Sequence, residues 1–249
     1  MNYHWDWGIF WELSPDGVHT YLQTLLLGTG WTLLTSAAAF TIALAFGSLI
    51  GVLRTTPFTC AVRLGNVYVE IFRNIPLLVQ MFLWYFVLPE VVPRAVGTWL
   101  KQLSNASFYT AVVALGLYMS ARIAEQVRAG IMSLPRGQRN AALALGLTLP
   151  QTYAYVLLPL AYRILMPPLT SELLNTIKNS AVALTIGLME LTARARAMQE
   201  FSFQVFEAFA AATLIYIVIN IAVTFGMRAL ERRVAVPGLI GVKARDAGH

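Results

Sequence analysis

The chain has few of the residues that carry most enzyme chemistry. It holds one cysteine, Cys60, so an internal disulfide is excluded. Its three histidines are His4, His19 and His249, and all of them lie outside the long apolar runs. This placement excludes a haem with axial histidines, an H-E-x-x-H metal site and a Ser-His protease within a membrane. We therefore expect neither a catalytic centre nor a metal site.

Lysines are equally scarce, and the nucleotide-binding pattern G-x-x-x-x-G-K-[ST] is missing from the sequence. The only lysines are Lys101, Lys178 and Lys243, and none of them follows a glycine-rich loop. Such a loop cradles the phosphates of ATP with its backbone N–H groups. We therefore expect no ATP hydrolysis by this chain and no cofactor bound to it.

Charged residues make up only 12% of the 249 residues, and 57% are hydrophobic. Soluble domains usually carry about 25% charged residues. Charge-free runs cover 22–53, 74–89, 104–121 and 208–227. Since a spanning helix needs roughly 20 apolar residues, the composition predicts an all-α membrane protein. We expect a single transmembrane domain over 1–249, with about five spans: 22–53, 64–88, 108–130, 151–176 and 207–230.

Basic residues predict how these spans are oriented. The residues before the first span include acidic side chains but no arginine or lysine, which places the N-terminus outside and indicates no cleaved signal peptide. Arginines in the connections 54–63 and 128–139, and in the tail 228–249, place these segments inside. The net charge of +6 comes mostly from this inner excess and implies no nucleic-acid partner. Arg194 and Arg196 fall in an expected outer loop and oppose the charge rule.

Charged residues within expected spans must face a bundle interior, a partner charge or a water-filled cavity, and four of them form two closely spaced pairs. Glu70 and Arg73 are three residues apart in the second span, so they can pair on one helix face. Arg122 and Glu125 have the same spacing in the third span. Each arginine is thus either a structural partner of its glutamate or a ligand for a substrate carboxylate, which a guanidinium binds through two parallel hydrogen bonds.

Small residues and prolines shape the other spans. Ala43, Gly47 and Gly51 recur every four residues in the first span, which favours helix packing within the chain over contact with another subunit. Pro76 removes a backbone hydrogen bond in the middle of the second span. The polar segment 150–191 is broken by Pro167-Pro168, so we expect a span followed by a short re-entrant or capping helix along a polar pathway.

The connection 136–150 reads as a helix, a turn and the start of a second helix. Its alanines favour a helix over 138–145. Gly146 can end that helix in a left-handed conformation. Thr148 can cap the next helix, in whose first turn Pro150 is tolerated.

The spacing of this connection is specific. Asn-Ala-Ala at 140–142 is followed by three residues and a glycine, and nine more residues lead to Val156, one residue and Leu-Pro. This pattern resembles the E-A-A signature loop of ABC-type importer permeases, with asparagine in place of the glutamate and valine in place of the isoleucine. The resemblance implies that four residues of the loop couple the chain to a separate ATPase: Asn140, Ala141, Ala142 and Gly146.

Further stretches at 70–80, 126–138 and 177–187 resemble the polar amino acid branch of that family. Residues 5–10 and 121–128 bring the chain closest to the glutamate/aspartate importer permeases, and the resemblance covers nearly all of 1–240. It implies a MetI-like (type I ABC importer) fold in a bacterial inner membrane. It also implies a second homologous permease subunit, in a heterodimer or homodimer, two inner ATPase subunits that hold ATP and Mg²⁺, and an outer substrate-binding protein.

We therefore expect the chain to form a pathway for glutamate or aspartate by alternating access. The expected substrate-binding residues are cationic or carry an amide or hydroxyl: Arg122, Arg73, Asn74, Asn179 and Ser180. Buried arginines argue against a cationic substrate, since like charges repel in a low dielectric, but a neutral amino acid such as glutamine is an alternative. A stand-alone carrier or channel is another, which neighbouring genes for a second permease, an ATPase and a binding protein would exclude.

Overall fold

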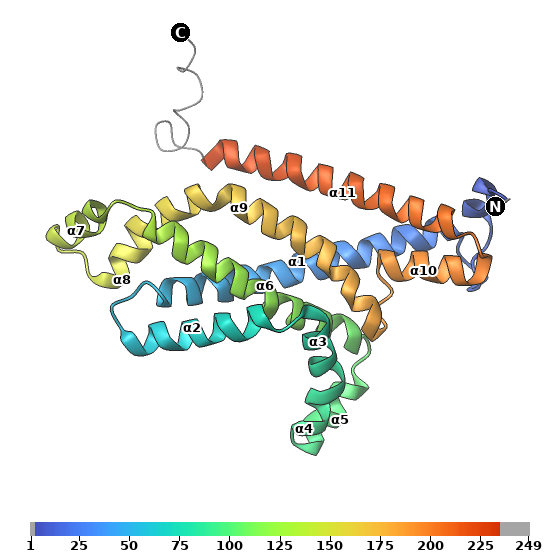
Figure 1. Cartoon of the computed structure of the whole chain (residues 1–249), viewed down its shortest axis with the longest axis horizontal. Coiled ribbons are helices and arrows are strands. Elements are labelled where there is room, and N and C mark those ends of the chain that lie inside the picture. The colour runs from blue at the N-terminus through green and yellow to red at the C-terminus, as the bar shows by residue number, and fades with distance from the viewer. Residues whose placement is uncertain (1–2, 235–249) are drawn as a thin grey trace, which may run out of the picture.

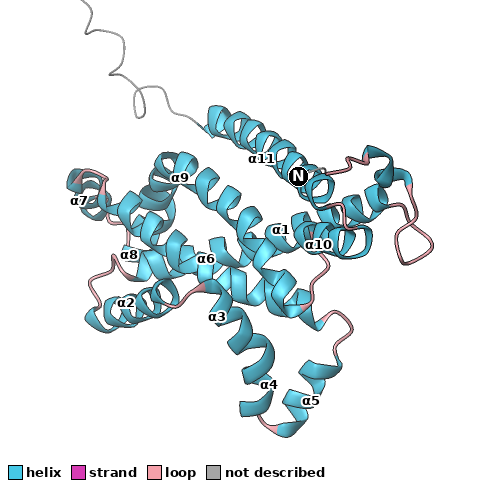
Figure 2. Cartoon of the chain, turned by 45° about the vertical axis from the view of Figure 1, so that its right-hand side comes forward, coloured by secondary structure: helices cyan, strands magenta, loops and turns pink. Residues whose placement is uncertain are grey.

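The computed structural model describes residues 3–234, and this part of the chain consists of helices and loops without a strand (Figure 2). Four helices of more than twenty residues run along the long axis of the molecule (Figure 1): α1 (Tyr21–Leu53), α6 (Ala106–Met132), α9 (Leu158–Asn179) and α11 (Val205–Val234). The predicted all-α class is confirmed. Lys243 and Arg245, expected on the inside as part of the tail, lie outside the described residues.

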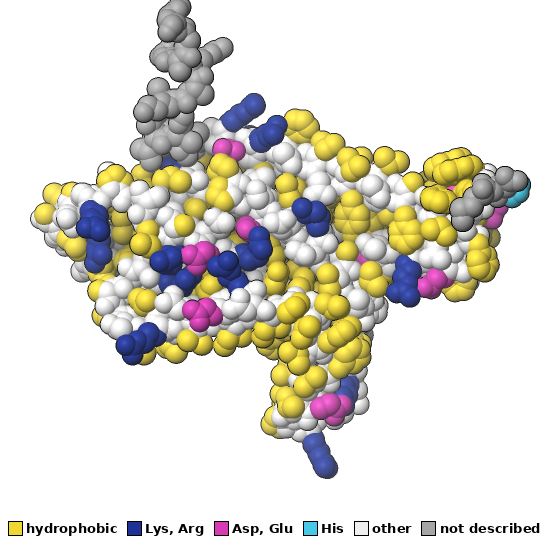
Figure 3. Space-filling model, viewed as in Figure 1, with side chains coloured by type: hydrophobic (Ala, Val, Ile, Leu, Met, Phe, Trp, Pro, Cys, Tyr) yellow, Lys and Arg dark blue, Asp and Glu magenta, His cyan; other side chains and the backbone are white. Residues whose placement is uncertain are grey.

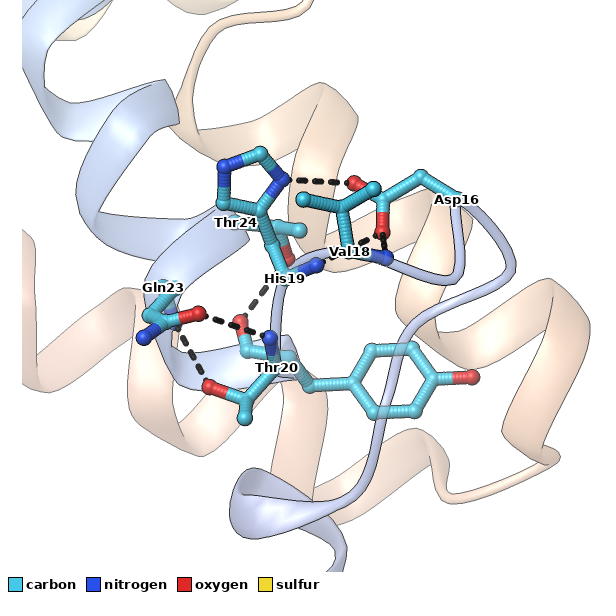
Figure 4. A network of polar contacts seen from close by, with 7 residues as sticks. Asp16, Val18, His19, Thr20, Gln23 and Thr24 are labelled. Atoms are coloured by element: carbon cyan, nitrogen blue, oxygen red, sulfur yellow. Dashed lines mark hydrogen bonds and ion pairs between the residues drawn. The ribbon is translucent and has the colours of Figure 1, made fainter.

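The first long helix, α1, begins at a reciprocal cap. The backbone N–H of Gln23 donates to Thr20 Oγ1 at 3.3 Å, and Gln23 Oε1 accepts from the N–H of Thr20 at 3.0 Å (Figure 4). In the loop before it, Asp16 Oδ1 accepts from the backbone N–H groups of Val18 and His19, both at 2.9 Å. The capping box of Thr20 and Gln23 satisfies donors at the helix start and determines where the apolar helix begins.

The small residues of α1 lie against α6. Ala43 is fully buried. A Cβ atom on Gly47 would come within 2.7 Å of the Ser120 carbonyl oxygen, and one on Gly51 within 2.8 Å of the next such oxygen along α6, that of Ala124. Backbones this close leave no room for a side chain. The prediction that this spacing serves packing within the chain is confirmed.

The chain turns sharply at Pro76. Helix α2 (Thr59–Asn74) ends before this proline, and the helical segment Leu77–Val91 leaves at 100° to it. Gln80 Nε2 donates to the carbonyl oxygens of Phe72 and Ile75, both at 2.9 Å, so these two acceptors are satisfied at the break. The prediction of a proline within one continuous helix is therefore wrong. The helix ends before Pro76, the chain bends by 100°, and the Gln80 amide replaces the lost backbone donors.

Beyond the bend, the chain forms an arm that projects from the bundle (Figures 1 and 2). The arm consists of α3 (Leu77–Phe82), a π-helical turn (Leu83–Val87), α4 (Leu88–Val91) and α5 (Arg94–Gln102). An exposed ion pair joins its two sides, with Lys101 Nζ 2.5 Å from Glu90 Oε1. The arm returns the chain to the bundle at α6.

The segment 150–191 is also irregular, but its breaks do not lie at the double proline. Helix α9 runs uninterrupted through Pro167 and Pro168. A short helix, α8 (Leu149–Thr152), and a π-helical turn precede it, and a 3₁₀ segment (Ser180–Ile186) leads from it to α10 (Leu191–Ser202). The predicted break at the prolines is wrong, since a membrane-protein helix can continue through proline when its neighbours hold it in place. The predicted short helix after the span corresponds to the 3₁₀ segment, and α10 begins where the predicted segment ends.

Three described helices, α1, α6 and α11, are long and apolar enough to cross a membrane, and the bent pair formed by α2 and Leu77–Val91 would make a fourth. Helix α9 is less apolar because it carries Arg163, Glu172 and Lys178. The count of five spans and their orientation stay predictions.

Helix α10 lies at the end of the bundle where the N-terminus lies (Figure 1). Its first backbone N–H, at Leu191, donates at 3.1 Å to Thr32 Oγ1, in the N-terminal half of α1. Arg194 and Arg196 therefore lie on the same side as the N-terminus, as predicted against the charge rule. The charge of Arg196 is offset by Glu200, with Nε 2.8 Å from Oε1.

Candidate functional site

The predicted coupling loop has the expected shape. Helix α7 (Arg136–Ala144) ends where Gly146 takes a φ of +85°. The N–H of Gly146 donates to the Leu143 carbonyl at 3.0 Å, and the N–H of Leu147 donates to the Ala142 carbonyl at 3.2 Å. These two bonds form a Schellman motif, whose left-handed residue is normally glycine. The predicted helix and its glycine stop are confirmed.

The next helix starts as predicted. The backbone N–H of Thr148 donates to Gln151 Oε1 at 2.8 Å, and Pro150 lies in the first turn of α8. Pro150 needs no hydrogen-bond acceptor there, because the first N–H groups of a helix have no partner within it. Hydrogen bonds thus hold both the end of α7 and the start of α8.

The two faces of α7 differ. Ala142 is 4% exposed and packs toward the rest of the chain, whereas Asn140 and Ala141 are exposed. Leu143 is also exposed, and Leu145 is 84% exposed just beyond the helix. Leu143 and Leu145 thus add apolar surface to the exposed part of the loop. Of the four predicted coupling residues, Ala142 lies on the inner side of the loop, and Asn140 and Ala141 lie on the outer side.

Arg122 of α6 pairs with Glu172 of α9. Arg122 Nε donates to Oε2 at 2.8 Å, and Nη2 donates to Oε1 at 3.3 Å. The Glu172 side chain is 5% exposed, whereas that of Arg122 is 41% exposed. The expected pair of Arg122 with Glu125 is therefore wrong, because the contact between two packed helices replaces the contact within one helix. Sequence alone gave no signal for a partner 50 residues away.

Glu125 instead faces three arginines. Its carboxylate accepts from Arg54 Nη1 at 2.7 Å and from Arg128 Nη1 at 2.9 Å, and Arg73 Nη1 lies 4.0 Å away. The expected pair of Glu70 with Arg73 is also wrong, since Glu70 is exposed and makes no ion pair within the described chain. One negative charge among three positive charges leaves this cluster positive. Figure 3 shows the basic side chains gathered over α2, α6 and α7.

The amide and hydroxyl candidates differ in accessibility. Asn74 is exposed at the end of α2, and Asn179 is half-buried at the end of α9. Ser180 is fully buried, and its Oγ donates to the Ile177 carbonyl at 2.8 Å, so it offers no surface to a substrate. The assignment of substrate-binding residues stays a prediction, with Ser180 the least suited by its position.

Sequence reasoning missed Glu190, which is fully buried where α1, α10 and α11 meet. Its carboxylate accepts from the backbone N–H groups of Thr192 and Ala193 at 3.0 and 2.8 Å, and from the hydroxyls of Thr32 and Tyr216 at 3.3 and 3.0 Å. A carboxylate at a helix start satisfies free N–H groups and interacts well with the helix dipole. The only local signal was an acidic residue before a helix-forming stretch.

Comparisons with known proteins agree with this geometry. A family model described as "Binding-protein-dependent transport system inner membrane component" matches residues 43–236. The chain is 48% identical over 246 residues to the glutamate/aspartate import permease protein GltJ of Escherichia coli (strain K12), which covers 98% of this chain and 100% of that protein.

Solved structures extend the likeness to the fold. The structure described as "an amino acid ABC transporter with histidines" has a TM-score of 0.72 at 30% identity, and the match covers 86% of this chain and 95% of that chain. The MetNI methionine ABC transporter in inward facing conformations also gives a TM-score of 0.72, at 21% identity, over 90% of this chain and 100% of that chain. The predicted MetI-like permease fold is thus confirmed.

The family resemblance inferred from the loop spacing is confirmed as well. Proteins of this family are permease subunits and not enzymes, because ATP is hydrolysed by a separate subunit. The matched region includes α2, the arm, α6 and the whole coupling loop. The chain therefore belongs to the family of inner membrane components of binding-protein-dependent transport systems.

Proposed function

We propose that the chain forms one half of the transmembrane pathway of an ATP-driven importer for acidic amino acids, and that it works by alternating access. The observation that carries the substrate class is the 48% identity, over nearly the whole chain, to a permease named for glutamate and aspartate import. The positive cluster around Glu125 and the partly exposed Arg122 support the same class, since guanidinium groups favour carboxylate ligands.

Arg122 retains donors for a substrate. Glu172 accepts from Nε and Nη2, whereas Nη1 makes no bond to it. A guanidinium has five N–H donors in a fixed fork, so its free edge can meet a second carboxylate while the first bond persists. Arg73 offers another exposed guanidinium beside Asn74, and Asn179 offers an amide at the end of α9. We assign substrate contact to these four residues.

Coupling to ATP occurs through α7 in this proposal. The sequence lacks a phosphate-binding loop, so ATP and Mg²⁺ bind to partner subunits. The exposed Asn140 and Ala141 contact the ATPase directly, and Ala142 and Gly146 hold the loop in shape. The complete importer contains a second homologous permease subunit, two ATPase subunits on the inside and a substrate-binding protein on the outside.

A competition assay tests the substrate class. The purified complex is reconstituted in liposomes with binding protein outside and ATP inside, and uptake of labelled glutamate is measured against unlabelled glutamate, aspartate, glutamine and arginine. We expect aspartate to compete strongly and glutamine and arginine weakly. Strong competition by glutamine would assign a neutral substrate instead. Uptake without the ATPase subunits would support a stand-alone carrier and contradict the importer.

A further inference from the structure

A pocket of about 380 Å³ lies where α1 and α6 end and α7 begins. Its volume is in the range of small-molecule binding sites. Four arginines contribute to its lining: Arg54, Arg128, Arg136 and Arg139. Four apolar side chains also line the pocket: Ile131, Met132, Leu134 and Leu157. The pocket therefore combines positive charge with a hydrophobic surface.

The positive charge of this pocket is only partly balanced. Arg54 and Arg128 share the single carboxylate of Glu125. Arg136 and Arg139, both on α7, make no ion pair within residues 3–234. Guanidinium groups gathered in a recess with low-dielectric walls raise the local potential, and an anion in the recess would lower the energy of the group.

In the predicted orientation, the pocket lies at the inner ends of α1 and α6, where a lipid headgroup would lie. Its arginine on the α1 side, Arg54, directly follows the charge-free run that ends at Leu53, and Met132 is the last residue of α6. The hydroxyl of Tyr153 donates to the backbone carbonyl of Thr55 at 2.8 Å and holds one wall in place. A site lined by both guanidinium groups and apolar side chains matches a ligand with a charged head and a hydrocarbon body.

We propose that this pocket binds the phosphodiester headgroup of an anionic phospholipid from the inner leaflet. Arginine recognises phosphate oxygens through parallel charged hydrogen bonds, and basic pockets between spanning helices on the cytoplasmic side suit anionic headgroups. The proposal rests on the inner-face position of α7 in the proposed function and adds a ligand to it. A headgroup bound by Arg128 and Arg139 would link the end of α6 to the coupling helix and hold α7 in place for its partner.

Lipid retention tests the proposal on the assembled complex. The permease pair with its ATPase subunits is equilibrated with phosphatidylglycerol or phosphatidylcholine, and native mass spectrometry counts the bound lipids. We expect the wild-type complex to retain phosphatidylglycerol selectively. Each basic residue near an anionic surface raises the affinity for it roughly fivefold, so the double variant R136Q/R139Q should weaken lipid binding about 25-fold. The R136K/R139K variant keeps the charge but not the parallel hydrogen bonds, so it should restore retention only in part.

A matched control separates this site from general charge. R94Q/K101Q also removes two positive charges, from the exposed arm, where Lys101 pairs with Glu90, and should leave retention unchanged. Equal retention of both lipids by the wild-type complex would overturn the proposal, whether or not any variant assembles. So would unchanged retention in R136Q/R139Q with loss of the ATPase subunits, because the arginines would then bind that protein.

A soluble anion is the remaining rival ligand. The thermal stability of the complex is therefore measured with inorganic phosphate, with glutamate and with phosphatidylglycerol. The lipid assignment would be overturned if either soluble anion stabilised the complex as much as phosphatidylglycerol does and R136Q/R139Q abolished that stabilisation. Glutamate uptake by the same samples is measured separately. Selective lipid retention without glutamate uptake would contradict the proposed substrate and leave the lipid site standing.

Discussion

Replacement of Arg122 has two separable effects, because this residue pairs with a buried carboxylate and is also assigned to the substrate. In Arg122→Ala, the Glu172 side chain, which is 5% exposed, would lose both of its hydrogen bonds from the guanidinium. Breaking a fully buried ion pair costs about 3–5 kcal/mol, and an exposed pair contributes only about 0–1 kcal/mol. Since Arg122 is 41% exposed, we expect a loss of about 2 kcal/mol in the free energy of unfolding.

A double-mutant cycle distinguishes structure from substrate contact. Glu172→Gln alone keeps the partly exposed guanidinium in contact with water, so we expect a smaller loss, of about 1 kcal/mol. The double variant Arg122→Ala/Glu172→Gln no longer buries an unpaired charge and should be more stable than Arg122→Ala alone. Stability is measured by thermal unfolding of the assembled complex.

Transport then assigns the role. If Arg122 holds a substrate carboxylate, glutamate uptake falls in Arg122→Ala and in the double variant, whereas Glu172→Gln keeps most of it. If Arg122 only pairs with Glu172, uptake follows stability and returns in the double variant. Recovered uptake in the double variant would refute the substrate role. Uptake that Glu172→Gln abolishes on its own would refute the separation of the two roles.

Three other predictions follow from local geometry. In Gly146→Ala the new Cβ would meet no atom within 4 Å, but a residue with a Cβ would have to adopt φ = +85°, which costs roughly 1–2 kcal/mol, so the ratio of uptake to ATP hydrolysis should fall. The ratio should fall less in Gly146→Asn, and an equal ratio in the two variants would contradict the backbone argument. Gly47→Leu should abolish assembly in gel filtration because its Cβ would collide with α6, whereas Gly30→Leu, in open space, should assemble normally. The backbone N–H groups of His19 and of the residue before it lower the pKa of Asp16 below its usual 3.8, so its stabilisation of the loop is present above that pH and is lost as pH falls. Hydrogen exchange of those amides, corrected for the intrinsic exchange rate at each pH, should show this loss as a fall in protection, and Asp16→Asn should remove the pH dependence of that protection.

Local features of the fold could be predicted from sequence because neighbouring residues determine them. The end of α7 depends on the glycine at 146, and the start of α8 depends on Thr148 with Gln151 three residues later. The packing stripe of α1 was also visible, because a four-residue spacing of small side chains places them on one face. In each case a few residues that are close in the sequence determine the geometry.

Contacts between distant segments could not be predicted in the same way. The i,i+3 spacing of Arg122 and Glu125 predicted a pair, but Glu172 lies closer once α6 packs against α9. At Pro76 the sequence showed a lost hydrogen bond but not the 100° bend, which depends on Gln80 reaching back to two carbonyl oxygens. The sequence gave little sign of the role of Glu190, because its partners Thr32 and Tyr216 lie on α1 and α11, which meet α10 only in the folded chain.

The position of the charged groups on α6 gives this helix a central part in the proposed coupling. Arg122 connects it to Glu172 of α9, and one turn further along, Glu125 connects it to Arg54 at the end of α1. Only three residues separate the end of α6 from the start of α7. In the proposed function, a displacement of α7 by a partner subunit therefore acts on α6 through this short connection and on α9 through α8, and the two ion-pair groups join α6 to α9 and α1. The guanidinium assigned to the substrate lies on the same helix, so loop movement and substrate contact share one structural element.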